Sequence, residues 1–493
     1  MVAGFFASNN FLIGMVTAVE ASYCAILLPG VETMKLAQQR LVLVSKQIYP
    51  PDTAEETLAN FSDAMQQCAL QLNPALIRTT LLEENADHTL TEIMSICRIH
   101  DQDVCRFALY LMLREHPEWF HQKQGSYHTN TDAQVQEYIQ KELWQEQHNL
   151  DLQASPLLAK KGLPVLFTPE LIRTAEAIKP YCHTSDRSDS TKLECWTIDA
   201  PVSQDLDDAI SIHKAAQGWE IGIHIADVDW YVEAGSPLDT EARRRTSSAY
   251  LPDRDVHMLP PSLSCDKASL LSAGIRPALS VFISCDAAGN QLSHHICLTS
   301  ICISRRFSYD EIETLLNQTS TPRQNDPTER IKALFMITEN HLQQRIKAGA
   351  YIPQQNLLTP ARRLVAECMV ICNSLLAALA KERKAPLFFR YLDESALPER
   401  RENQAETSFP PSVMGTSPQP HQAMGLSCYA QASSPLRRYS DLVNQRQIKS
   451  LLQGTALPYT KSELDDMLEH LEQTRQRLRQ VTLQAESLVK KPV

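Results

Sequence analysis

The chain has 493 residues, 43% of them hydrophobic, and a formal net charge of −11 from 47 Lys and Arg against 58 Asp and Glu. This length exceeds what one hydrophobic core serves, so we expect two to four domains, and the composition excludes bulk disorder. The acidic balance excludes a protein that coats nucleic acid with a basic exterior, so any nucleic acid has to be held by a local basic channel.

Residues 1–50 are rich in Val, Ile and Leu with turn residues between them, which predicts a small β-barrel-like module. The first basic residue is Lys35, which favours a β-strand start over a signal peptide. The chain has no uninterrupted apolar run of about 18 residues, so we expect no membrane partner. Thirteen cysteines without a C-x-x-C pair are typical of reduced thiols in a cytoplasmic protein.

Residues 51–155 change to helical periodicity. Between 85 and 128, a helix, a turn, a second helix and a strand-loop segment follow one another, which is typical of a winged helix-turn-helix. Two interpretations stay open, a DNA-binding regulator and a helical packing domain. Few Lys or Arg lie on the second helix, which argues against the reading of DNA. A linker over 156–185 follows.

The largest predicted domain covers 186–455. Alternating apolar residues predict strands from 193 to about 310, then a long helix from 361, a loop over 395–424 and a helix from near Pro435. The spacing of Cys368 and Cys372 indicates the core face of a helix. A zinc site is the weaker interpretation of His294, His295, Cys297 and Cys302, which lack paired ligand spacing.

Four carboxylates crowd the stretch TIDAPVSQDLDDAI, residues 197–210, with no Lys or Arg among them: Asp199, Asp205, Asp207 and Asp208. Like charges this close repel one another, and a magnesium ion, which prefers carboxylate ligands, offsets that repulsion. The alternative is a solvated acidic loop, although the apolar Ile198, Leu206 and Ile210 argue against full exposure.

Two further segments could contact a nucleic acid. SSPLRRYSDLVNQRQ, residues 433–447, carries arginines that can grip a phosphate, or it forms an exposed basic helix face. YLPDRDVHMLPPSLS, residues 250–264, begins with Tyr250, whose ring can stack on a base or can simply be packed.

Four segments in chain order resemble the ribonuclease II and ribonuclease R family of 3′-to-5′ exoribonucleases with its RNB domain, in its bacterial branch with a winged-helix-like N-terminal region. They are TIDAPVSQDLDDAISI, HIADVDWYV at 224–232, YLPDRDVHMLPPSLS and SSPLRRYSDLVNQRQ. The resemblance spans roughly 183–455. It implies a multidomain α/β (α+β) fold, with a small N-terminal β-barrel-like module, a helical winged-helix-like domain, and a large RNB catalytic domain of mixed sheet and surrounding helices.

The resemblance also implies roles for single residues. Asp199, Asp205, Asp207 and Asp208 would bind one or two Mg²⁺ ions, or Mn²⁺, with Asp207, Asp208 and Arg437 as catalytic residues. Tyr250 would stack on the 3′-terminal base, and Tyr309, Glu367 and Arg438 would contact the substrate. The enzyme, an RNase II-type phosphodiester hydrolase, would degrade single-stranded RNA processively to nucleoside 5′-monophosphates in cytoplasmic RNA turnover, as a monomer without a dedicated protein partner.

Some positions depart from the family pattern. Gln445 stands where a His is usual, and Ala432 and Ser433 replace Phe and Thr. The chain ends within a predicted helix over 456–493, where relatives continue into an OB-fold RNA-binding domain. We therefore expect weaker binding of long RNA and reduced processivity, and the alternative function is a catalytically impaired RNA-binding or regulatory homologue.

Overall fold

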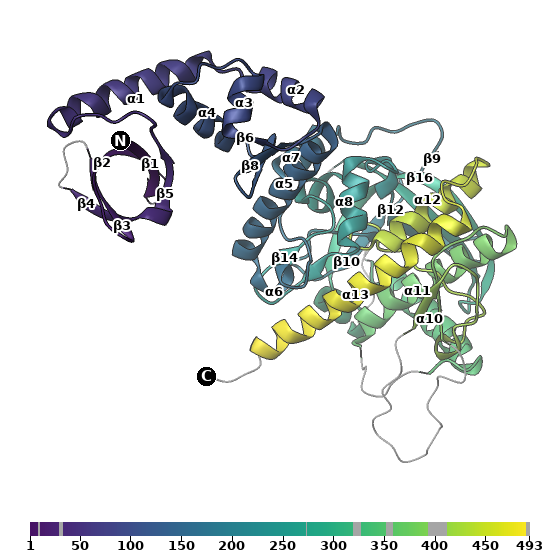
Figure 1. The fold of residues 1–493 in the computed structure, drawn as a ribbon. Coiled ribbons are helices and arrows are strands. Elements are labelled where there is room, and N and C mark those ends of the chain that lie inside the picture. Colours follow the sequence, from purple (N-terminus) through teal and green to yellow (C-terminus); the bar gives the residue numbers. More distant parts are fainter. Residues whose placement is uncertain are drawn as a thin grey trace. The chain divides into compact units, whose positions relative to one another are not determined.

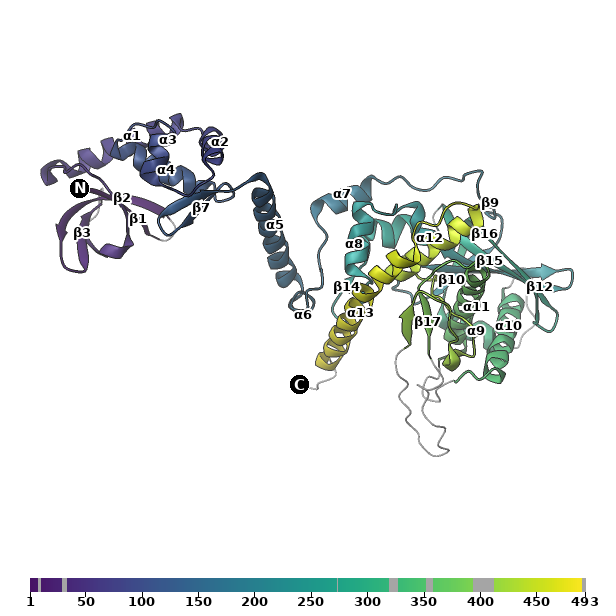
Figure 2. The ribbon, with the colours of Figure 1, turned by 45° about the vertical axis from the view of Figure 1, so that its right-hand side comes forward.

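The computed structural model describes residues 1–7, 10–28, 33–272, 274–318, 327–351, 358–392 and 412–489. The chain divides into two compact units, Met1–Gln147 and His148–Val493, and the helix α5 (Asp132–Ala154) spans the boundary between them. Figure 1 and Figure 2 show the ribbon from two sides. Each unit is described by itself. The domain limits that the sequence predicts stay predictions: 1–50, 51–155, 156–185, 186–455 and 456–493.

The first unit begins with a curved, antiparallel five-stranded sheet in the order β4-β3-β2-β1-β5 (Figure 1). Its strands are β1 (Val2–Ala7), β2 (Asn10–Val19), β3 (Tyr23–Leu27), β4 (Met34–Ala37) and β5 (Leu41–Val44). Phe5, Ile26 and Leu36 are buried together against this sheet. The predicted strand at the N-terminus is therefore confirmed.

The rest of this unit has the order of elements of a winged helix. The elements are α1 (Ala54–Gln71), α2 (Pro74–Glu84), β6 (His88–Thr89), α3 (Leu90–Ile96), α4 (Asp103–Glu115), β7 (Phe120–Lys123) and β8 (Ser126–Thr129). The three strands form one sheet, β6-β8-β7. In α4, the helix that would read DNA, Phe107, Leu109 and Leu113 are at most 1% exposed. This helix forms the core of the unit, which favours the packing interpretation over DNA reading.

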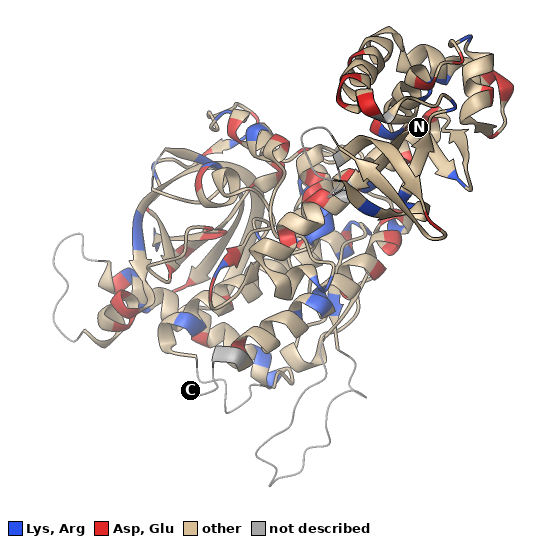
Figure 3. Cartoon of the chain, turned by 60° about the vertical axis from the view of Figure 1, so that its left-hand side comes forward, with Lys and Arg blue, Asp and Glu red and all other residues tan. Residues whose placement is uncertain are grey.

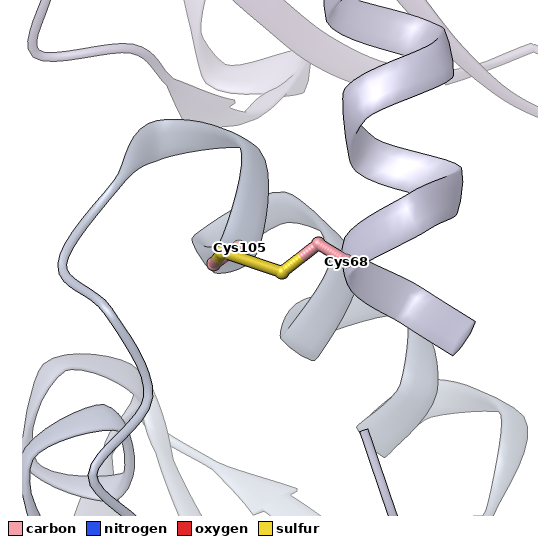
Figure 4. The surroundings of a disulfide bond; sticks show 2 residues. All are labelled: Cys68 and Cys105. Atoms are coloured by element: carbon pink, nitrogen blue, oxygen red, sulfur yellow. A yellow bond between two sulfur atoms is a disulfide. The ribbon is translucent and has the colours of Figure 1, made fainter. Parts of the chain in front are cut away.

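The cysteines correct one expectation. Cys68 of α1 and Cys105 of α4 form a disulfide, with Cα atoms 5.6 Å apart (Figure 4). The prediction of thirteen reduced thiols is wrong for this pair, because the packing of α1 against α4 brings together two residues 37 positions apart, and their spacing gives no sign of it. Closing a loop of this length restricts the unfolded chain, a stabilisation of about 3 to 4 kcal/mol. The remaining cysteines are free thiols.

The second unit is built on a mixed sheet in the order β10-β11-β12-β15-β16-β9. Its strands are β9 (Ser188–Asp189), β10 (Cys195–Asp199), β11 (Asp208–Ala215), β12 (Gly218–Ala226), β15 (Ile275–Asp286) and β16 (Gln291–Ser308). Because β10 pairs antiparallel with β11 and parallel with β16, the sheet closes on itself. Two short pairs complete the strands, β13 (Ala249–Tyr250) with β14 (Asp255–Val256) and β17 (Phe389–Tyr391) with β18 (Val413–Gly415).

Helices cover this sheet around two hydrophobic cores. In β12, Ile221, Ile223 and Ile225 alternate toward the first core, which α10 (Thr328–Lys347) and α11 (Pro360–Glu382) complete. The second core holds residues of α8 (Pro237–Arg245), α12 (Tyr439–Gln453) and α13 (Lys461–Val489). The other helices are α6 (Pro156–Ala159), α7 (Pro169–Ala177) and α9 (Tyr309–Asn317). The predicted multidomain α/β fold with a mixed sheet and surrounding helices is confirmed.

The helix α11 is long and apolar enough to cross a membrane by length and composition alone, but 56% of its most apolar window is buried inside the structure. Cys368 and Cys372 lie on its buried face, which confirms their prediction as core residues. This is the pattern of a core helix, and it is weak evidence for a membrane span. The candidate zinc ligands around Cys297 lie on β16, and the described residues form no metal-holding group there.

The helix α12 corrects a second expectation, since it begins at Tyr439 rather than near Pro435. Residues 435–437 form a turn, and the extended Arg438 pairs with Ser247 in an isolated bridge. Asp441, which is fully buried, accepts a hydrogen bond from the backbone N–H of Ser434 at 3.0 Å. The side chain of Asp441 thus holds the turn against the helix start, and Arg437 projects from the turn instead of from a helix face.

A buried histidine joins three strands of the second unit. His224 in β12 is 0% exposed, with Nε2 3.0 Å from Ser211 Oγ in β11 and Nδ1 2.7 Å from Ser280 Oγ in β15. Gly222 beside it leaves the room, because a Cβ there would lie 2.4 Å from Ser211 Oγ and 2.6 Å from His224 Nε2. Burial lowers the pKa of His224 from 6.5 to about 3.

This histidine should make folding stability depend on pH. Below pH 6.5 the unfolded chain binds a proton at His224 that the folded chain excludes. The free energy of unfolding therefore decreases as the pH is lowered from 6.5 to the folded pKa of about 3, by up to about 1.4 kcal/mol per pH unit. We expect the stability difference between the wild type and His224→Gln to narrow below pH 6.5 and to stay constant above it. Urea unfolding, monitored by hydrogen exchange of β12, measures the free energy of unfolding of both proteins. A stability difference between them that is the same at pH 7.5 and at pH 5.5 contradicts the prediction.

Candidate active site

The four aspartates lie where two adjacent strands meet. Asp199 is the last residue of β10 and Asp208 the first residue of β11, so the loop between them begins and ends in the sheet. Strand β10 lies within the region from 193 to about 310 for which alternation predicts strands. Since β10 and β11 are paired antiparallel neighbours, the sheet places the two carboxylates at one end of the same strand pair.

Asp207 joins this loop to the segment that carries Arg437, 230 residues later. Asp207 is 3% exposed, and its Oδ1 accepts from the backbone N–H of Leu436 at 2.8 Å. Its Oδ2 accepts from Arg437 Nε at 2.7 Å, and Arg437 Nη2 donates to Ser434 Oγ at 2.9 Å. Burial raises the pKa of Asp207 to about 6, although Arg437 and Leu436 favour its charged form. One of the four predicted carboxylates, that of Asp207, is therefore in contact with the arginine that is predicted to bind phosphate.

Asp199 and Asp208 differ from Asp207, because within the described part of the chain no donor hydrogen-bonds to either carboxylate. Burial and the charge of Asp207 raise the pKa of Asp199 to about 7. Burial and the charges of Asp199 and Asp207 raise the pKa of Asp208 well above its ordinary value. These two carboxylates repel each other, and a cation between them would relieve that repulsion.

Asp205 faces the aromatic residue of the site. Its Oδ2 accepts from the hydroxyl of Tyr250 and lies 4.0 Å from His257 Nδ1. Tyr250 is 42% exposed, so its hydroxyl end meets the carboxylates while much of the residue faces solvent. Burial and Asp205 raise the pKa of its hydroxyl, which stays protonated and donates. Stacking of this ring on a base stays a prediction.

The donor set fits a hard divalent cation in its chemistry, since it consists of carboxylate oxygens in a partly buried, repulsive cluster. As the side chains stand, no group of three or more His, Cys, Asp or Glu among the described residues encloses a point where an ion could sit. Two of the carboxylates are engaged by Arg437 and Tyr250. Asp199 and Asp208, which have no such partner, would hold the ion, and Asp205 and Asp207 would join them.

The other predicted substrate residues divide into two groups. Tyr309, at the start of α9, lies near Asp199 and Asp208, which together with burial raise its pKa, and Arg362 lies 4.3 Å from its ring centroid. We therefore expect Tyr309 to face the substrate.

Glu367 and Arg438 are both paired with other side chains of the protein. Glu367 is 4% exposed and accepts a hydrogen bond from Arg345 at 2.6 Å. The first oxygen of Glu367 also accepts from His341 Nδ1 at 2.6 Å and from Arg345 Nε at 2.8 Å, so both oxygens hold α10 and α11 together. Arg438 Nη2 donates to Asp441 at 2.6 Å, while its buried Nε has no hydrogen-bond partner among the described residues. These contacts favour positioning over direct substrate contact for both residues.

A buried charge network, which the sequence did not indicate, anchors α12 behind the site. Lys449 Nζ lies 2.8 Å from Asp227 and 2.7 Å from Asp229. Arg446 Nε lies 2.8 Å from Asp229, and its Nη1 lies 2.7 Å from Asp239. Because Lys449 is 8% and Arg446 only 2% exposed, the interpretation of 433–447 as an exposed basic helix face is wrong. Asp227 and Asp229 lie within the segment HIADVDWYV, the one signal that could have indicated the network.

Gln445 shows why a departure from the family pattern is tolerated. Its Nε2 donates to the carbonyl of Ala226 at 2.8 Å, and its Oε1 accepts from the N–H of Val228 at 3.1 Å. An amide side chain donates and accepts at once, as the two nitrogens of a neutral His do. Gln445 thereby holds the end of β12 against α12.

Comparisons with known proteins point to one family. The model of the RNB domain family matches residues 187–411 and 397–454. An uncharacterized ribonuclease of Synechocystis is 28% identical over 365 residues, 69% of this chain and 54% of the relative. The chloroplastic/mitochondrial ribonuclease II of Arabidopsis thaliana is 28% identical over 344 residues, 62% of this chain and 42% of the relative. The chain thus spans about half the length of these curated relatives.

Two solved structures share the fold. Mycoplasma genitalium RNase R in complex with ribose-methylated single-stranded RNA is 22% identical, with a TM-score of 0.60 over 69% of this chain and 64% of that chain. Yeast Ssd1, described as a pseudonuclease, is 19% identical, with a TM-score of 0.56 over 64% of this chain and 46% of that chain. The family model covers more than half of the chain, and the chain belongs to the RNB family, whose curated relatives here are named ribonucleases.

Proposed function

We propose that the protein is a metal-dependent 3′-to-5′ exoribonuclease that hydrolyses single-stranded RNA to nucleoside 5′-monophosphates. The observation that carries the proposal is the contact of Arg437 Nε with Asp207 at 2.7 Å, which places a guanidinium against one of the four clustered carboxylates. Hydrolysis of a phosphodiester needs a cationic group that stabilises the negative charge of the phosphate. It also needs ligands for a metal ion that activates the attacking water. The RNB relatives support the substrate class.

The residues of the chain divide the work. Arg437, held through Ser434, would bind the scissile phosphate and neutralise the charge that grows on it. The ring of Tyr250 would stack on the terminal base, while its hydroxyl keeps Asp205 oriented. Bound Mg²⁺ would polarise the phosphate and lower the pKa of a coordinated water. Mn²⁺ has the same preference for oxygen ligands, so the proposal allows Mn²⁺ in place of Mg²⁺.

We further propose that the protein is a monomer, and that it acts processively in the turnover of RNA in the cytoplasm. A narrow, locally cationic path for RNA is compatible with a net charge of −11, because attraction of a phosphate depends on nearby groups. Figure 3 shows both signs of charge on the strands and helices of the larger unit.

The second candidate function is a catalytically impaired RNA-binding or regulatory homologue. Its support is the structural similarity to yeast Ssd1, described as a pseudonuclease. The electrostatics favour the active enzyme, because Asp199 and Asp208 are kept in mutual repulsion without a hydrogen-bond donor in the described structure. That repulsion costs stability, and a bound cation is what would make it useful.

An RNA degradation assay separates the two functions. With 5′-labelled single-stranded RNA and Mg²⁺, we expect a ladder of products that shortens from the 3′ end, and EDTA should abolish it because the carboxylates then lack their ion. Intact RNA that is bound in a gel shift would instead support the impaired homologue. A 3′-labelled copy of the same RNA should release labelled mononucleotide first.

Asp208→Asn should separate catalysis from stability. It removes a charge that repels Asp199 and Asp207 but breaks no hydrogen bond in the described structure, so hydrolysis should fall by about 10³-fold or more while the metal-free protein becomes more stable. Single-turnover rates and thermal unfolding in EDTA measure both effects. Asp207→Asn is the matched comparison, because it also disturbs the contacts to Leu436 and Arg437 and should lose stability. Wild-type hydrolysis by Asp208→Asn contradicts the site.

Substitutions at Tyr250 should separate stacking from hydrogen bonding. Tyr250→Phe keeps the ring and loses the bond to Asp205, whereas Tyr250→Ala loses both. Stacking on a base contributes about 1 to 3 kcal/mol, so Tyr250→Ala should raise KM for short RNA by about 10- to 100-fold, and Tyr250→Phe should leave KM nearly unchanged. Steady-state kinetics on a short oligonucleotide give the answer. Equal KM values for the two variants are incompatible with stacking.

A further inference from the structure

The loop between Asp199 and Asp205 closes around one side chain. Arg306 Nη2 lies 2.7 Å from the carbonyl oxygen of Ala200, 3.2 Å from that of Pro201 and 2.7 Å from that of Ser203. Three carbonyl oxygens that converge on one point repel one another unless a cation or donor lies between them. The guanidinium of Arg306 is therefore what allows this loop to take its shape.

Packing does little to hold the same loop. Val202, in its middle, is 87% exposed, and Pro201 and Gln204 are exposed as well. Within the loop, the N–H of Ser203 donates to the carbonyl of Ala200 at 3.0 Å. Without a buried apolar residue between Pro201 and Gln204, the position of the loop depends on polar contacts to its neighbours.

The side chain of Arg306 starts from a fixed backbone. Arg306 lies in β16, where it pairs with Thr197 of β10, and Asp199 pairs with Ser308 in the same parallel ladder. The next residue, Phe307, is 0% exposed and packs edge-on against Trp196 with ring centroids 5.6 Å apart. Arg306 thus connects the loop to a buried strand pair, two residues along the chain from the partner of Asp199.

A second contact fixes the other end of the loop. Ser269, which is fully buried, donates from Oγ to the carbonyl of Gln204 at 2.7 Å and accepts from the N–H of Leu206 at 2.9 Å. These two contacts lie on either side of Asp205. Arg306 and Ser269 together define the path of the chain from one carboxylate to the next.

We propose that Arg306 is a positioning residue of the active site, which clamps loop 200–205 so that Asp199 and Asp205 stand in place to share a divalent cation. The inference rests on the exoribonuclease function proposed above and assigns to Arg306 an effect on metal binding that acts through the loop. Groups that orient metal ligands in this way typically change metal affinity by about 10- to 100-fold.

The test compares Arg306→Ala with Arg305→Ala. Arg305 is the adjacent residue on the same strand, with a side chain 50% exposed, 3.5 Å from Glu311 and 4.1 Å from the ring centroid of Phe307. Its removal takes away one positive charge of the strand and leaves the three carbonyl contacts of Arg306 in place. Direct binding of Mn²⁺ is followed by electron paramagnetic resonance without RNA. Amide hydrogen exchange of residues 200–206 is followed in the metal-free protein.

We expect Arg306→Ala to bind Mn²⁺ about 10- to 100-fold more weakly and to exchange the Ser203 amide about tenfold faster, with Arg305→Ala like the wild type in both measurements. RNA hydrolysis by Arg306→Ala should recover in part at high metal concentration. Unchanged Mn²⁺ affinity, or equal loss in both variants, overturns the proposal.

A second variant covers the case in which Arg306→Ala fails to fold. Arg306→Met keeps an unbranched side chain but has no donor for the three carbonyl oxygens, and faster exchange of residues 200–206 with an unchanged remainder of the sheet supports the clamp, whereas wild-type exchange overturns it. The exchange measurement needs neither metal nor RNA. If the wild-type protein neither binds Mn²⁺ nor degrades RNA, the exoribonuclease proposal fails, and exchange still decides whether Arg306 holds the loop.

Discussion

The site depends on one buried carboxylate. Asp207 accepts hydrogen bonds from the side chain of Arg437 and from the backbone N–H of Leu436. A carboxylate that is 3% exposed has lost most of its hydration, and only charged or strongly polar donors can compensate for that loss. Both donors come from the turn before α12, so the same interaction closes the fold and brings Arg437 to the carboxylates. Removal of the Arg437 side chain would leave the buried charge of Asp207 with only the backbone donor of Leu436.

The surrounding network follows from this requirement. A turn that donates to Asp207 has to be held at a fixed distance from β11, and α12 is held by Lys449 and Arg446 against Asp227, Asp229 and Asp239. Buried ion pairs of this kind contribute little net stability compared with apolar packing, but they allow few alternative arrangements. We interpret them as the reason why α12 has one register against the loop after β12.

The sequence predicted the chemical groups of the site better than their positions. The four aspartates, Arg437 and Tyr250 are apparent because their residue types stand in recognisable segments, and strand alternation predicted β12, β15 and β16. The start of α12 was missed because Asp441 and Asp207 hold residues 435–437 in a turn. The spacing of residues contains no sign of such side-chain contacts. For the same reason the pairing of Cys68 with Cys105, and of Glu367 with Arg345, could be found only in the folded chain.

Parallel pairing of β10 with β16 imposes a constraint on this architecture. Side chains alternate along a strand, so a slip of one residue would turn Phe307 out of the core and move Arg306 to the opposite face. The buried contact of Trp196 with Phe307 penalises that slip, because both rings would lose their apolar surroundings. The hydrophobic register of one strand pair therefore determines which face carries the guanidinium, and through it the conformation of the aspartate loop. In this fold, the electrostatics of the site depend on the packing directly beneath it.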